Sequence, residues 1–317
     1  MALQNPLNIQ ELLDLCIGFV SESRPTILSC SLVARAWVDT AQSHLFHNPL
    51  CIPQRHSRAD TDAMALKFLD ALQLSPHLAR HVRALHFIQV EPDSTVEQIC
   101  TFDFTHLEKL TIEVEDWIEY WQSEALLRVL SLPTLRFLAI YSTVPVPSSC
   151  ETLFRRLSPR IQHLKLACPP WDLREIQAGG HAASPMRLKS LRLDADPAQC
   201  LHLGIMDISN LLALSVWHED KISWNMILHR TIQSLRILNL RLSIFEEDWV
   251  DLSIFPNLEV FRVDHAYTLS ALCHTVTTVP SPRVIIIAVF YLNFEHDECD
   301  VFDRILGSFD SSPLPIV

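Results

Sequence analysis

A short pattern of aliphatic positions recurs along most of the chain: one aliphatic residue, two others, a second aliphatic, one other, and a third. Leu235, Leu238 and Leu240 show this frame clearly. Nine copies begin at positions 82, 107, 135, 161, 188, 211, 235, 258 and 284, about 25 residues apart on average. The last three positions alternate as in a β-strand, so Leu238 and Leu240 share one face and Asn239 lies on the other. The pattern therefore predicts nine short strands.

One short strand cannot bury an apolar face alone, so such repeats must stack side by side and support one another. A period of this length is typical of leucine-rich repeats. The predicted fold is an α/β solenoid, a leucine-rich-repeat horseshoe with a parallel sheet, with about nine irregular repeats over residues 81–295. Prolines two or three residues ahead of a frame are expected to end a preceding helix without removing a sheet donor. They are Pro133, Pro159, Pro185, Pro256 and Pro282.

The two ends of the chain do not follow this repeat. Apolar residues at helical spacing predict three short helices within residues 1–48, over about 9–20, 26–33 and 35–45. Residues 49–80 are expected to form a connecting strand and helix. Residues 296–317 are expected to form a capping helix and tail that cover the open edge of the sheet.

Composition narrows the classes of function. The net charge of −12 disfavours nucleic acid or an anionic membrane as the main partner. Only 5 of the 317 residues are glycine, and neither of the glycine-rich phosphate-binding motifs occurs, so no nucleotide cofactor is expected. GxSxG, HExxH and CxxC are also absent from the sequence. The chain is therefore expected to have no catalytic residues, no metal site and no cofactor.

The 9 cysteines are scattered singly, which indicates reduced thiols in a cytoplasmic or nuclear protein. The N-terminus lacks a basic stretch followed by an apolar one, so no signal peptide is expected. No apolar run approaches the roughly 20 residues that cross a bilayer, so no membrane partner is expected.

The first fifty residues contain a more specific pattern. Glu11–Leu15 reads ELLDL, Leu28–Trp37 reads LSCSLVARAW, and His44–Phe46 closes the stretch. About residues 5–47 thereby resemble an F-box, most specifically in Ser-Leu-Val followed by a basic residue and a tryptophan. The opening differs, because Asn8 and Ile9 stand where the motif usually has Leu-Pro. An F-box ahead of irregular leucine-rich repeats is similar to the large F-box group of filamentous and mushroom-forming fungi.

The resemblance implies a non-catalytic substrate-recognition subunit of an SCF-type (Skp, cullin, F-box) ubiquitin ligase, monomeric on its own. The F-box would dock on the Skp adaptor, and through it on a cullin, while the repeats hold a protein substrate. Carried over by position, the apolar adaptor face comprises Ile9, Leu12, Leu13, Ile17, Leu28, Leu32, Val33 and Trp37. The alternative interpretation is that these residues are the core of a three-helix cap over the first repeat.

Residues just before and just after the last aliphatic of each frame lie outside the buried layer. Near the middle of that surface, the expected concave face, these positions hold four basic residues, two aromatic residues and an asparagine: Tyr141, Lys165, Arg192, Trp217, Asn239, Arg241 and Arg262. Arginine forms bidentate, charge-assisted bonds, so we hypothesise a site for an acidic or phosphorylated peptide. The alternative is that Asp194 and Asp264 neutralise Arg192 and Arg262 in solvated cross-strand pairs.

Two functions stay open at this point. The first is the ligase substrate receptor. The second is a leucine-rich-repeat interaction scaffold that has kept the helical cap but no longer assembles with a ligase, which the Asn8-Ile9 opening favours. Recovery of adaptor and cullin with the native protein distinguishes them.

Overall fold

The structure is a computed structural model that describes residues 10–47, 58–88, 94–114, 123–142, 156–167, 186–193, 206–218, 228–242, 251–264, 278 and 285–289. The chain divides into two compact units, Met1–Leu138 and Ala139–Val317. Ile9, the connecting residues 49–57 and the predicted capping helix and tail at 296–317 lie outside the described residues.

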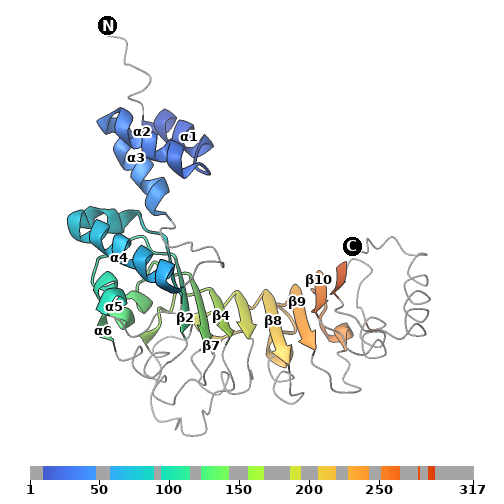
Figure 1. Ribbon diagram of the computed structural model, residues 1–317. Helices are drawn as coiled ribbons and strands as arrows, with labels where there is room; N and C mark the ends of the chain where they lie inside the picture. The colour runs from blue at the N-terminus through green and yellow to red at the C-terminus, as the bar shows by residue number, and fades with distance from the viewer. Residues whose placement is uncertain are drawn as a thin grey trace. The chain divides into compact units, whose positions relative to one another are not determined.

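The first unit begins with helices. They are α1 (Gln10–Phe19), α2 (Arg24–Val33), α3 (Arg35–Phe46), α4 (Arg58–Leu74) and the 3-10 helix η2 (Pro76–His81) (Figure 1). The first three lie within two residues of the predicted spans at both ends. Pro25 stands in the first turn of α2, where its missing N–H leaves no hydrogen bond unmade. No described helix is both long and apolar enough to cross a membrane.

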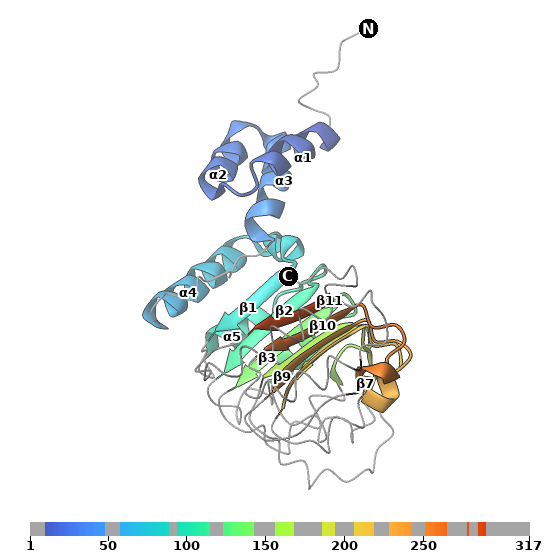
Figure 2. The ribbon, with the colours of Figure 1, turned by 90° about the vertical axis from the view of Figure 1, so that its right-hand side faces the viewer.

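Strands and helices alternate in the rest of the first unit. The order is β1 (Ala84–Ile88), α5 (Ser94–Cys100), β2 (Lys109–Val114), α6 (Glu124–Leu130) and β3 (Phe137–Ser142), whose last residues belong to the second unit. Figure 2 shows β1 and β2 side by side, and they pair in parallel with Leu85 opposite Leu110. Because β1 and β2 are parallel, they are not joined as a hairpin; the chain between them, which includes α5, returns to the end of the sheet where β1 began.

The second unit repeats the strand at each frame. Its strands are β4 (His163–Ala167), β6 (Ser190–Leu193), β8 (Ala213–His218), β9 (Ile237–Leu242), β10 (Val260–Asp264) and β11 (Ile285–Val289). The 3-10 helix η6 (Leu252–Ile254) precedes β10. Two short strands that the sequence did not predict, β5 (Met186–Arg187) and β7 (Met206–Asp207), pair with each other in a separate parallel sheet.

Nine strands follow one another in the order β1-β2-β3-β4-β6-β8-β9-β10-β11. Every strand pair whose register is described is parallel, and equivalent frame positions face one another; Leu191 pairs with Leu214, for example, and Leu214 with Leu238. The predicted α/β class with a parallel sheet is confirmed at this level. The frame also sets the register, since a shift by one residue would move its aliphatic side chains to the opposite face.

The register predicted for the ninth frame was wrong by one residue. The sequence pattern aligned Ile287 with Phe261, whereas the structure pairs Ile286 with Phe261 and Ile287 with Arg262. Residues 284–289 read VIIIAV, and an unbroken aliphatic run fits two registers equally well. Only pairing with β10 decides between them.

The aliphatic and aromatic side chains of the frames form much of the core. No described frame side chain from Val82 to Phe261 is more than 4% exposed. Three of the prolines ahead of the frames have a more specific place than predicted, at the second position of a β-turn that Pro favours. The turns are closed by N–H to carbonyl bonds from Leu135 to Leu132, Ile161 to Ser158 and Leu258 to Phe255, at 3.1, 3.2 and 3.3 Å.

Candidate partner-binding surfaces

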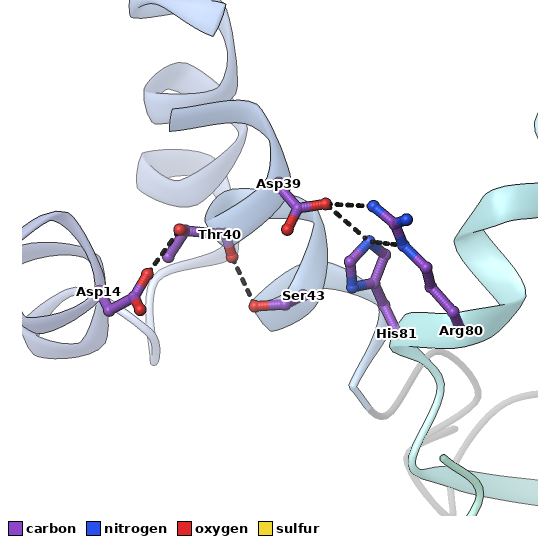
Figure 3. Close-up of polar contacts among 6 residues, drawn as sticks. All are labelled: Asp14, Asp39, Thr40, Ser43, Arg80 and His81. Atoms are coloured by element: carbon purple, nitrogen blue, oxygen red, sulfur yellow. Dashed lines mark hydrogen bonds and ion pairs between the residues drawn. The ribbon is translucent and has the colours of Figure 1, made fainter. Parts of the chain in front are cut away.

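The three N-terminal helices form a small module around α3, which packs against both α1 and α2. Ile17 from α1, Ile27 from α2, and Ala41 and Leu45 from α3 make its buried core. Thr40, which is buried, donates a hydrogen bond of 2.6 Å from Oγ1 to Oδ1 of Asp14 (Figure 3). This bond ties α3 to α1 and satisfies a hydroxyl that would otherwise cost free energy to bury.

Large apolar side chains are exposed on the same module. On α1 they are Leu12, Leu15 and Phe19, and on α2 they are Leu28, Leu32 and Val33. Leu12, Leu15 and Phe19 are three and four residues apart, and Leu28 and Leu32 are four apart, so each of these sets lies along one side of its helix. Val33 directly follows Leu32. Phe19 and Leu32 are 81% and 86% exposed. Burial of either by a partner would contribute about 1.5–3 kcal/mol before the costs of association.

The predicted adaptor residues divide into three groups in the structure. Leu12, Leu28, Leu32 and Val33 are exposed and available for contact. Leu13 and Ile17 are each 1% exposed, so they belong to the interior and match the cap-core alternative. Trp37 is half-buried and packs against the core cluster. Leu15 and Phe19 were not predicted, although their spacing from Leu12 was a signal in the sequence.

Polar contacts join α3 to η2 at the start of the repeats. Asp39 Oδ1 lies 2.6 Å from Arg80 Nη2 and 3.3 Å from His81 Nε2 (Figure 3). The carbonyl of His47 also accepts hydrogen bonds from the N–H groups of Arg83 and Ala84, at 3.1 and 3.0 Å. These contacts form the α3–η2 joint. No sequence signal marks it, because Asp39 and Arg80 are 41 residues apart.

The His47 carbonyl occupies a place that recurs along the repeats. The carbonyl of Arg83 accepts from Glu108 and Lys109, and that of Glu108 accepts from Arg136 and Phe137, all at 2.8–3.0 Å. In the second unit the carbonyl of Lys189 accepts in the same way from Leu212 and Ala213. The end of the helical module therefore stands where a preceding strand would begin.

His81 holds an unusual position in the joint. Its Nε2 faces the Asp39 carboxylate, which accepts hydrogen bonds, and Arg80 Nε, which donates, at 3.4 Å. The nitrogen can satisfy only one of them in a given protonation state. Burial lowers the pKa of His81, Asp39 raises it, and Arg80, His77 and His106 lower it. The neutral ring, which accepts from Arg80, is therefore favoured at neutral pH.

The predicted peptide site lies on the strands of the second unit. In β4, β6, β8 and β9 the frame residues are buried, while Lys165, Arg192, Ser215 and Asn239 between them are partly exposed. Arg262 on β10 is exposed. The Lys165 amine lies 4.4 Å from the centre of the Tyr141 ring, a cation–π contact. Trp217 pairs with Arg241 in the strand register, but their side chains lie outside the described part.

The two arginines are not isolated charges. Arg192 and Arg262 each take part in an interaction within the chain. The side-chain oxygen of Asn239 is buried and has no hydrogen-bond partner among the described residues. The structure thus brings five of the seven predicted side chains onto one face and leaves Trp217 and Arg241 placed only by their backbone.

Among the described residues there are few candidates for a metal site or a reactive nucleophile. No group of three or more His, Cys, Asp or Glu side chains there could hold a metal ion. Burial raises the pKa of the Cys100 thiol to about 12, so this side chain is protonated and a poor nucleophile at neutral pH.

Comparison with protein-family models and with curated proteins identified no relative. A scan against protein-family models found no match to the chain, and a search of curated proteins found none either.

Proposed function

We propose that this protein is the substrate-recognition subunit of an SCF-type ubiquitin ligase. Its helical module, the proposed F-box, docks on a Skp-type adaptor and thereby on a cullin. Its frames form an irregular leucine-rich-repeat solenoid that holds a protein substrate. The protein is itself non-catalytic.

One observation supports the docking role above the others. Among the described residues, ten large hydrophobic side chains are exposed, and six of them lie on α1 and α2. A helical module that served only as a cap would turn its apolar side chains inward. Concentrated exposed apolar surface is typical of protein–protein contact sites.

The location of these side chains agrees with the resemblance to an F-box. Leu28, Leu32 and Val33 belong to the LSCSLV stretch, its most specific part, and all three are exposed on α2. Leu12 lies in the ELLDL stretch on α1. The residues that the motif singles out are thus largely the ones that helix packing leaves uncovered.

A matched pair of substitutions tests the proposal. Leu32 and Leu74 are both 86% exposed, and Leu74 lies outside the helical module at the end of α4. Tagged wild-type protein is expressed in a cell that contains the Skp adaptor and cullin, and both are measured after purification. Leu32→Asp is expected to abolish their recovery because it places a charge in an apolar interface, whereas Leu74→Asp is expected to leave it unchanged.

The outcomes separate the two functions. Reproducible absence of adaptor and cullin with the wild-type protein would reject the ligase function and favour the scaffold that no longer assembles with a ligase. Equal loss with Leu74→Asp would show that a general effect of charge, not docking, is measured. Trp37→Ala is a weaker test, because Trp37 packs on the module core and its removal also destabilises the helices.

A further inference from the structure

A continuous row of polar and basic side chains crosses the strands of the second unit. In the strand register Lys165 lies opposite Arg192, Arg192 opposite Ser215, Ser215 opposite Asn239, and Asn239 opposite Arg262. The neighbouring frame residues on the same strands are buried. These five side chains, the basic row, therefore share the face opposite the core.

The charge of the row is opposite to that of the chain. The whole protein has 37 acidic and 25 basic residues, yet the row has three basic residues and no acidic one. The Tyr141 ring beneath the Lys165 amine holds that charge at one end of the row without neutralising it. A ligand that complements the basic row carries negative charge.

We infer that the basic row binds an extended peptide with two acidic or phosphorylated side chains about four residues apart. One contacts Lys165 and Arg192, and the other contacts Arg262. The inference deepens the proposed function, because such a peptide would be the substrate segment that the receptor holds. It does not require that the adaptor binds.

The spacing follows from strand geometry. Lys165 and Arg192 are on adjacent strands, so both reach one carboxylate or phosphate. From β6 to β10 there are three strand-to-strand steps of about 4.8 Å each, roughly 14 Å in total. An extended peptide advances about 3.3 Å per residue, so roughly four residues cover that distance. Ser215 and Asn239 lie between the two ends; the partly exposed Ser215 offers its hydroxyl to the peptide backbone, whereas the Asn239 side-chain oxygen is buried.

The interactions that Arg192 and Arg262 already make are compatible with this role. A guanidinium group carries five N–H donors, so an arginine that holds one partner within the chain still contacts a second acceptor.

Fluorescence anisotropy with the purified full chain tests the inference. The probes are labelled ten-residue peptides with two phosphoserines, or two glutamates, separated by two to eight residues in a Gly/Ala/Gln background. We expect saturable binding that is tightest near a separation of four residues and weakens as salt is raised. Phosphoserine is expected to bind more tightly than glutamate, since it carries more charge and more acceptor oxygens.

Variants assign the binding to the row. Arg192→Glu and Arg262→Glu are each expected to weaken binding at least about tenfold. Arg160→Glu makes the same charge change at an exposed position in the turn before β4 and is expected to have an effect of less than about twofold. Circular dichroism confirms that each variant is folded.

Several results would overturn the inference. They are affinity that does not depend on the separation of the two acidic groups, equal loss with Arg160→Glu, unchanged affinity in both row variants, or full competition by single-stranded RNA at equal charge. Leu32→Asp is expected to leave peptide binding intact. Failure of the peptide site and failure of adaptor docking are therefore distinguishable.

Discussion

The strand frames bury their large aliphatic side chains, whereas the helical module leaves several of its own exposed. Leu238, on β9, is completely buried, and every described frame residue is 4% exposed or less. Leu32, on α2, is 86% exposed, with five more large apolar side chains exposed on the same two helices. One region therefore uses its aliphatic residues for its own stability, and the other holds many of them at the surface. Apolar surface that folding leaves uncovered is available to a partner.

The frames are expected to give the largest effect on stability. Leu238→Ala removes a buried side chain between two paired strands, which costs about 2–5 kcal/mol in cores. Its neighbour Ile237 is 43% exposed, so Ile237→Ala is the control and is expected to cost less than about 1 kcal/mol. Urea unfolding followed by circular dichroism measures both. Equal losses would contradict the assignment of the buried face.

The interior of the helical module is expected to give a smaller effect. Thr40→Val keeps the shape of a buried side chain but removes the hydroxyl that donates to Asp14. We expect a loss of about 0.5–1.5 kcal/mol, the usual net value of one hydrogen bond. Ser43→Ala serves as a control, because its hydroxyl bonds the carbonyl of Thr40 within the same helix. Thermal unfolding of both variants decides whether the bond between α1 and α3 contributes more than the local one.

The joint between the two regions is expected to respond to pH. The pKa of His81 is lower in the folded than in the unfolded protein, so the unfolded state binds the proton more readily. The contribution of neutral His81 is fully present above pH 6.5 and is lost as the pH falls below that value. His81→Gln is therefore expected to make the free energy of unfolding less dependent on pH below 6.5. An unchanged slope in urea titrations would exclude His81 as a source of the dependence.

The exposed face of the module is expected to give the smallest effect on stability. Leu32→Ala removes a side chain that makes few contacts, so the free energy of unfolding should stay within about 0.5 kcal/mol of wild type. The same variant is expected to weaken adaptor recovery, which Leu74→Ala should leave unchanged. A stability loss of the size seen for Leu238→Ala would show that Leu32 is packed in solution, and the contrast between the regions would fail.

The position of the strands was largely predictable. The spacing of three aliphatic residues is a local property, and it located the strands at the first eight frames. The ninth failed by one residue because VIIIAV has no polar position to distinguish its faces. The short strands β5 and β7 were missed for a related reason, since two residues each are too few to show a period.

The candidate sites were predictable only in part. Leu12 and Leu13 are adjacent in the sequence and were assigned to one adaptor face, but α1 exposes the first and buries the second. Helical spacing predicts that two faces exist without saying which one meets α3. The α3–η2 joint could not be predicted, because Asp39, Arg80 and His81 become neighbours only through the packing of separate helices.

The amino-acid sequence by itself determined the repeat, the strand positions and the residues of the basic row, because each depends on alternation over a few consecutive residues. Tertiary structure decided which aliphatic side chains of α1 and α2 stay uncovered, where the last strand pairs, and how His81 lies between a carboxylate and a guanidinium. Those properties depend on contacts between segments far apart in the chain, whose burial and pairing energies no local pattern contains.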